Sequence, residues 1–246
     1  MEEFVYGKNP VKETLKIIKS GVLYILRKKS YDNIQDIIDK AKSKNIEIVY
    51  KDDSYFGKNF SDKNHQGISL LIKELHIPKF SEYDFIEYLE NSEINKEVIL
   101  LLDSIKDVGN LGGILRNALL FNVNYVILPK DNSCPVNDVV VKRSSGAALQ
   151  IKTIYVTNLV RIIDKLKDKG FWIYGADMDG KKLDTVEFPD KTVIVMGEEG
   201  TGMRSLVRKS CDEIISIQTN EKLDSLNVNV SSGIILYEVY KKLFFD

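Results

Sequence analysis

Short apolar segments alternate with amphipathic segments from Val98 to the end of the chain, and this alternation constrains the fold more than any other feature. Runs such as VILLLD (98–103), NYVILP (124–129) and KTVIVMG (191–197) contain few polar residues, as expected for strands that are buried on both faces. Helical patterns separate these runs, and parallel strands need such crossover connections. Residues 98–246 therefore predict an α/β domain whose parallel sheet is covered by helices on both faces.

The first third of the chain predicts a separate, small α/β domain over residues 1–77. Strand patterns occur at VLYILRK, IEIVY and GISLLIKE, and NIQDIIDKAKSK has the periodicity of an amphipathic helix. The polar residues 51–66 are expected to form a loop. The acidic residues 78–97 predict a linker that contains a short helix from about Tyr83 to Glu90.

Composition and charge exclude several classes of protein. The two cysteines, Cys134 and Cys211, form no CxxC pair, so neither a disulfide framework nor a zinc site is expected. The acidic N-terminus is interrupted by Pro10, unlike a signal peptide, and no apolar run reaches membrane-spanning length, which predicts a soluble, cytoplasmic protein. The formal net charge of −1 argues against a strongly basic nucleic-acid binder, although residues 1–77 carry 14 basic against 11 acidic side chains, a weak indication of RNA binding.

The segment from Val98 to Phe121 combines a strand, a glycine-bearing turn and a helix expected from about Leu111. A helical side chain leans toward the residues three and four positions earlier, which for Arg116 are Gly113 and Gly112. We expect the guanidinium group to lie along this bare backbone, toward the positive end of the helix, and to bind a phosphate or carboxylate. The alternative is a capped helix with a surface arginine.

A second glycine-rich turn follows the strand at 191–196, with glycines at 197, 200 and 202. Their order is not that of a dinucleotide fingerprint, and a P-loop lysine is missing. Glu198 and Glu199 would repel a phosphate tail, so the turn favours a neutral or cationic ligand. A plain tight turn is the alternative.

Polar residues crowd the start of the terminal helix, which is expected from about Asn227. Ser225 and Asn227 suit a helix cap, but polar groups at the start of an apolar helix also need partners, and a ligand could supply them. The helix is apolar nearly all round, and Leu236, Tyr240 and Phe244 would expose an apolar stripe in a monomer, which predicts a homodimer that buries this helix.

Together these segments resemble the SpoU/TrmH family of RNA ribose 2′-O-methyltransferases, within the SPOUT superfamily. NLGGILR (110–116) resembles the family's first motif, GEEGTG (197–202) its second and SLNVNV (225–230) its third, and HQGI (65–68) resembles the end of its N-terminal RNA-binding domain. The resemblance covers essentially the whole chain and is greatest with bacterial enzymes that methylate a guanosine ribose of 23S rRNA. The chain departs from the family pattern at Val108, Gly109, Gln218 and Asn229.

The resemblance implies a C-terminal domain with a deep trefoil knot, which is a rare exception to unknotted chains. It implies S-adenosylmethionine as the cofactor, bound at positions that match Gly197, Ile217 and Leu226. It implies catalytic roles for Asn110, Arg116, Glu199, Ser225 and Asn227, with no metal. It also implies a ribosomal-protein-like RNA-binding domain over 1–77, a methyltransferase domain over 98–246 and a homodimer with no DNA or membrane partner.

The expected reaction is attack of a ribose 2′-oxygen on the cofactor's methyl group. A guanidinium group is a poor base at neutral pH, so we expect Arg116 to bind an RNA phosphate and stabilise the developing alkoxide. A tRNA methyltransferase and a non-catalytic ribosome assembly factor on the same fold remain alternatives. An oxidoreductase is disfavoured because the dinucleotide fingerprint is missing.

Overall fold

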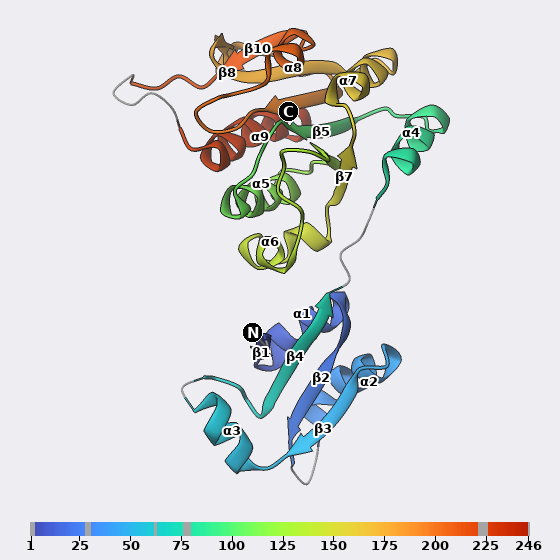
Figure 1. The fold of residues 1–246 in the computed structure, drawn as a ribbon, viewed down its shortest axis with the longest axis vertical. Helices are drawn as coiled ribbons and strands as arrows, with labels where there is room; N and C mark the ends of the chain where they lie inside the picture. Colours follow the sequence, from blue (N-terminus) through green and yellow to red (C-terminus); the bar gives the residue numbers. More distant parts are fainter. Residues whose placement is uncertain (1–2, 28–30, 62, 76–79, 221–225, 246) are drawn as a thin grey trace. The chain divides into compact units, whose positions relative to one another are not determined.

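The computed structural model describes residues 3–27, 31–61, 63–75, 80–220 and 226–245. Contacts divide the chain into two compact units, Met1–Ile77 and Pro78–Asp246 (Figure 1). None of the helices in the described ranges is long and apolar enough to cross a membrane.

The first unit is a four-stranded sheet in the order β1-β4-β2-β3, in which β4 is antiparallel to β1 and β2 while β3 is parallel to β2. Its elements are β1 (Glu3–Tyr6), α1 (Lys8–Ile17), β2 (Ile18–Leu26), η1 (Asp32–Ile34), α2 (Gln35–Ser43), β3 (Glu47–Lys51), α3 (Asp53–Phe60) and β4 (Ile68–Leu75). Helix α3 lies where a polar loop was expected. Its N-cap, Asp52, accepts a hydrogen bond from the backbone N–H of Tyr55 at 3.1 Å, and Phe56 and Phe60 are buried beneath it.

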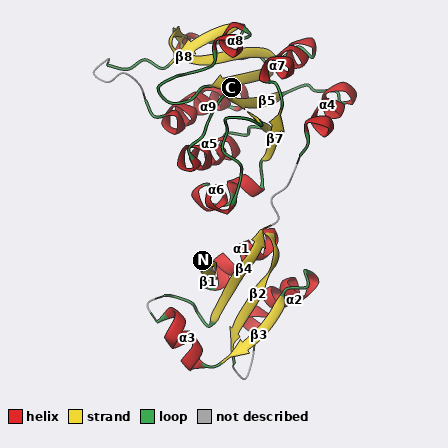
Figure 2. Ribbon diagram, viewed as in Figure 1, coloured by secondary structure: helices red, strands yellow, loops and turns green. Residues whose placement is uncertain are grey.

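The second unit confirms the predicted α/β fold with a parallel sheet. All five strand pairings of its six-stranded sheet are parallel, in the order β10-β8-β9-β5-β6-β7. Figure 2 draws the strands in yellow and the helices in red. Its elements are α4 (Glu82–Asn91), β5 (Glu97–Leu102), α5 (Val108–Leu120), β6 (Tyr125–Pro129), α6 (Asp138–Arg143), η2 (Ala147–Leu149), β7 (Lys152–Val156), α7 (Leu159–Asp168), β8 (Trp172–Lys182), η3 (Leu183–Thr185), β9 (Lys191–Met196), α8 (Ser205–Lys209), β10 (Glu213–Ser216) and α9 (Val228–Phe244).

Helices cover both faces of this sheet. On one face, α4, α7 and α8 share a hydrophobic core with strand residues such as Ile99 and Leu101. Helices α5 and α9 contact each other and lie on the opposite side (Figure 1). The trefoil knot stays a prediction.

The segment 78–97 differs from the expected linker. The expected short helix is present as α4, but its Phe85 and Leu89 are buried in the core of the second unit. Glu82, in its first turn, accepts a hydrogen bond from the backbone N–H of Thr157 at 3.0 Å. Helix α4 is therefore part of the second unit.

Candidate active site

The loops that follow β5 and β9 meet the start of α9. Helix α5 begins at Val108, earlier than expected, because Asp107 caps it and accepts a hydrogen bond from the backbone N–H of Asn110 at 2.7 Å. Helix α9 begins at Val228, and its N-cap Asn227 accepts from the backbone N–H of Asn229 at 3.0 Å. Asn110 therefore lies in the first turn of its helix and Asn227 at the cap of the other.

Three side chains from the three motifs converge at this point. The amide nitrogen of Asn227 donates to Glu199 Oε2 at 2.8 Å and to Asn110 Oδ1 at 3.0 Å. The Asn110 amide nitrogen lies 3.4 Å from the same Glu199 oxygen. The side-chain oxygen of Asn227 thus caps α9, while its side-chain nitrogen bonds to residues of the other two motifs. Asn227 is therefore both a helix cap and a part of the candidate site.

Arg116 is exposed on α5, and its position differs from the one expected. Its Nη1 donates to Ser145 Oγ at 3.3 Å, after the end of α6. A Cβ at Gly112 would lie 2.5 Å from Arg143 Cβ, and one at Gly113 would lie 2.3 Å from Asn229 Oδ1. The two glycines therefore admit α6 and the side chain of Asn229, and the expectation that they leave a path for the guanidinium group was wrong.

The second glycine-rich turn is closed by its own backbone. Glu198 N–H donates to the carbonyl of Gly202 at 3.2 Å, and Gly202 N–H donates back at 2.9 Å, with Gly200 and Gly202 both at positive φ. Lys106 Nζ lies 3.0 Å from Glu198 and lowers the pKa of that carboxyl. Lys106 therefore offsets one of the two acidic charges of the turn, while Glu199 faces the two asparagines.

Sequence reasoning missed a buried carboxylate directly below this turn. Asp103, at the end of β5, is fully buried and accepts hydrogen bonds from Arg204 N at 2.8 Å and Arg204 Nε at 2.7 Å. An aspartate directly after a buried strand was the available signal. This ion pair fixes the loop after β5 to the residues that follow the glycine-rich turn.

Two clefts lie in the second unit, one beside the loops that follow β5 and β9 and the other between α9 and the segments that follow β8 and β10. The smaller, of about 140 Å³, is lined by Ile105, Lys106, Asp107, Asn110, Glu198, Glu199 and Val228. The larger, of about 210 Å³, is lined by Leu183, Asp184, Ile217, Gln218, Ile234, Tyr237 and Glu238. Of the residues expected to bind the cofactor, Ile217 thus lines a cleft, whereas Gly197 and Leu226 are half-buried and line neither. Ser225, expected to be catalytic, lies outside the described residues.

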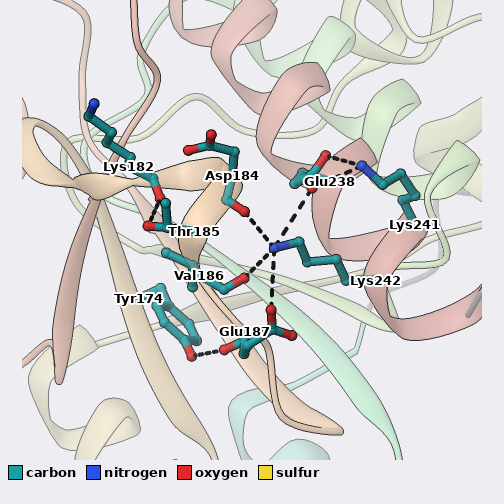
Figure 3. Close-up of polar contacts among 9 residues, drawn as sticks. All are labelled: Tyr174, Lys182, Asp184, Thr185, Val186, Glu187, Glu238, Lys241 and Lys242. Atoms are coloured by element: carbon teal, nitrogen blue, oxygen red, sulfur yellow. Dashed lines mark hydrogen bonds and ion pairs between the residues drawn. The ribbon is translucent and has the colours of Figure 1, made fainter.

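A lysine of α9 joins the two walls of the larger cleft. Lys242 Nζ donates to the backbone carbonyls of Asp184 at 2.9 Å and Val186 at 2.7 Å, and lies 3.9 Å from Glu238 Oε1 and 3.8 Å from Glu187 Oε1 (Figure 3). These contacts hold α9 against the segment that follows β8, next to Ile217.

The apolar surface of α9 differs in part from the predicted stripe. Leu236 is buried within the unit, so its inclusion was wrong, whereas Ile234, Tyr237 and Phe244 are exposed. The Phe121 ring packs edge-on against Tyr237 with a centroid distance of 5.8 Å. An apolar face therefore remains on α9 beside the end of α5. Among the described residues no cluster of three histidine, cysteine or carboxylate side chains could hold a metal ion.

Comparison with known proteins gives two family matches. Residues 97–237 match the model described as the SpoU rRNA Methylase family, and residues 4–78 match the model described as RNA 2′-O ribose methyltransferase substrate binding. The chain is 36% identical to a 23S rRNA (guanosine-2′-O-)-methyltransferase RlmB of Pectobacterium atrosepticum, over 98% of this chain and 99% of that protein. It is 30% identical to the putative TrmH family tRNA/rRNA methyltransferase YacO of Bacillus subtilis, over 98% and 96%. The AdoMet-bound rRNA methyltransferase structure from Sinorhizobium meliloti superposes with a TM-score of 0.72 at 18% identity, over 100% of this chain and 88% of that one.

Proposed function

The chain belongs to the SpoU rRNA methylase family, and from this premise we propose that it transfers a methyl group from S-adenosylmethionine to a guanosine ribose 2′-hydroxyl of 23S rRNA. The observation that carries the proposal is the convergence of Asn110, Glu199 and Asn227 within hydrogen-bonding distance, at the edge of a cleft. These residues come from three segments far apart in sequence, and two of them begin helices. Such an arrangement holds side chains on rigid elements, as transition-state stabilisation requires.

The residues present fit the proposed cofactor. Both clefts carry carboxylates, Glu198 and Glu199 in one and Asp184 and Glu238 in the other; lysines pair with Glu198 and Glu238, which leaves Glu199 and Asp184 to supply the negative charge. A carboxylate lining suits a cationic sulfonium and disfavours a cofactor with a phosphate tail. Backbone at Gly197, Ile217 and Leu226 would hold the cofactor, which when bound supplies the methyl group as an electrophile.

The protein's own part in the reaction is positioning and electrostatics. Asn227 and Asn110 orient the ribose or the cofactor, and Glu199 holds the two amides in place. Arg116 binds an RNA phosphate and stabilises the charge that develops on the 2′-oxygen, since a guanidinium group stays protonated at neutral pH. The hydroxyl proton passes to solvent, because a guanidinium group that stays protonated cannot accept it. Ser225 keeps its proposed catalytic role on the resemblance alone.

The two units have separate proposed roles in the reaction. Residues 4–78 match a substrate-binding family, which supports RNA binding by the first unit and catalysis by the second. The exposed Ile234, Tyr237 and Phe244 support a homodimer that buries this face of α9, since a monomer would expose an apolar patch beside the larger cleft.

The test is methyl transfer from radiolabelled S-adenosylmethionine to unmodified 23S rRNA and, in parallel, to unmodified tRNA, both transcribed in vitro. Label in 23S rRNA, mapped to a guanosine whose 3′ linkage resists alkaline hydrolysis, is the expected result. Label in tRNA alone would overturn the rRNA assignment and leave a 2′-O-methyltransferase. Absence of cofactor binding by calorimetry would instead identify a non-catalytic RNA-binding factor.

A further inference from the structure

Two exposed arginines lie at the contact between α5 and α6. Neither Arg116 nor Arg143 has a carboxylate partner among the described residues. Arg204 and Arg208 of the same unit contrast with them, since Arg204 pairs with Asp103 and Arg208 with Asp177 and Asp179. Arg161 on α7 also has no carboxylate partner among the described residues, so what distinguishes Arg116 and Arg143 is that two such arginines lie at one helix contact.

A glycine brings the two arginines together. Helix α6 contacts α5 at Gly112, where an added Cβ would lie 2.5 Å from Arg143 Cβ and 3.1 Å from the Arg143 carbonyl carbon. Gly112 is four residues before Arg116, and residues four apart share one face of a helix, one turn or about 5.4 Å apart. The side chains of Arg143 and Arg116 therefore leave the protein from neighbouring points on one surface.

The second residue after α6, Ser145, holds one of these guanidinium groups. Ser145 has a φ of 52°, a left-handed conformation that non-glycine residues rarely adopt, and its Oγ accepts a hydrogen bond from Arg116 Nη1 at 3.3 Å. Arg143 is thus the last residue of α6, and Ser145, two residues later, accepts the hydrogen bond from Arg116. This contact keeps Arg116 on the α6 side of α5.

Two like charges on adjacent rigid elements repel each other, and an anion between them removes this cost. Arginine suits phosphate because its planar fork makes paired hydrogen bonds. We propose that Arg143 is a second phosphate ligand beside Arg116, so that the RNA backbone next to the reacting ribose is held by two arginines, and that Ser145 is a positioning residue for Arg116. The proposal rests on the proposed function, because it takes RNA as the anion.

The experiment measures binding of fluorescently labelled, unmodified 23S rRNA transcribed in vitro, as a series in salt concentration. Each phosphate contact contributes about 0.7–0.9 to the slope of log affinity against log salt. Arg143→Ala is expected to lower this slope by about 1 and Arg143→Lys to keep it, since a lysine retains the charge. The matched control is Arg161→Ala, which removes the same charge from an exposed position on α7 (Figure 1). A slope for Arg143→Ala equal to that of wild type or of the control would overturn the proposal.

Single-turnover methylation tests the role of Ser145. Ser145→Ala removes only the hydroxyl and keeps the same backbone requirement, and it is expected to slow transfer by about 5-fold. The same substitution in an Arg116→Ala background is expected to have no further effect, whereas a merely structural role would slow both proteins equally and overturn the positioning role. If the wild-type protein transfers no methyl group, the proposed function fails, and the salt series still decides whether Arg143 contacts RNA.

Discussion

Replacement of Gly113 by alanine tests whether this glycine serves the contact between α5 and α9. An added Cβ would lie 2.3–2.4 Å from three atoms of the Asn229 side-chain amide, which must then move. The Asn229 side-chain amide accepts a hydrogen bond from Asn117 Nδ2 at 3.1 Å. Asn117 Nδ2 also donates to Ser232 Oγ at 2.9 Å. The substitution therefore disturbs a polar link between the two helices that carry Arg116 and Asn227.

The expected size follows from three opposing contributions. Alanine in place of glycine favours the helix by about 1 kcal/mol. Overpacking costs about 1–3 kcal/mol, and the lost amide hydrogen bond costs about 1 kcal/mol. We expect Gly113→Ala to lower the free energy of unfolding by about 2 kcal/mol. Asn229→Ala alone is expected to lower the free energy of unfolding by about 1 kcal/mol, because the hydrogen bond is lost. In the double variant the Cβ of the alanine at position 113 no longer overlaps the Asn229 amide, while the helix preference of alanine remains. The two changes together are therefore expected to cost close to zero.

The assay is urea denaturation followed by tryptophan fluorescence, because the single tryptophan, Trp172, lies in β8 and reports on the second unit alone. The four proteins form a double-mutant cycle whose expected coupling is about 3 kcal/mol in favour of the double variant. Additive effects of Gly113→Ala and Asn229→Ala, or a stabilising Gly113→Ala, would refute the assignment of this glycine to the Asn229 contact.

Four further predictions concern other parts of the molecule. Arg116→Ala is expected to slow single-turnover methyl transfer at least about 100-fold while cofactor affinity, measured by calorimetry, is unchanged; a near-normal rate would make it an ordinary surface residue. Tyr237→Glu is expected to convert a dimer into a monomer in light scattering, and a wild-type protein that is monomeric at micromolar concentration would contradict the dimer. Deletion of residues 1–77 is expected to weaken RNA binding and leave cofactor binding intact, which a folded fragment without cofactor affinity would disprove. Burial raises the pKa of Glu97, so the stability linked to its protonated form is present below about pH 4.3 and is lost as the pH rises through the raised value. The advantage of Glu97→Gln in urea denaturation should therefore grow from acidic to neutral pH, and a constant difference would rule this out.

The strand and helix pattern was predictable because burial leaves a local trace in the sequence. The run 98–102 has no polar residue and makes up all of β5 except its first residue, Glu97; this strand, one of the two central ones, is buried along its whole length. Helix α3 was missed although its signals were present, with Asp52 as a cap and the buried Phe56 and Phe60 four residues apart. The polar residues between those signals favoured the prediction of a loop over that of a helix.

The geometry of the site depends on partners distant in sequence, and spacing alone could not supply them. Gly112 and Gly113 looked like a bare path for Arg116 because their actual neighbours, Arg143 and Asn229, come from other helices. The link between Asn110 and Asn227 joins positions 117 residues apart, and only the family resemblance suggested that they meet. Helix α9 is apolar on both sides, so periodicity could not tell the buried Leu236 from the exposed Tyr237.

The order of strands in the second unit imposes a delay on its folding. Strand β5 is the first of the six in sequence, yet its register is completed by β9, whose last pair joins Leu102 to Met196. At a synthesis rate of about 5–20 residues per second, the 94 residues from Asp103 to Met196 take roughly 5–20 s to appear. During that interval one edge of β5 is unpaired, whereas the first unit can already be complete. Parallel pairing over such separations is slow, so a chain that stops before Met196 should aggregate rather than fold.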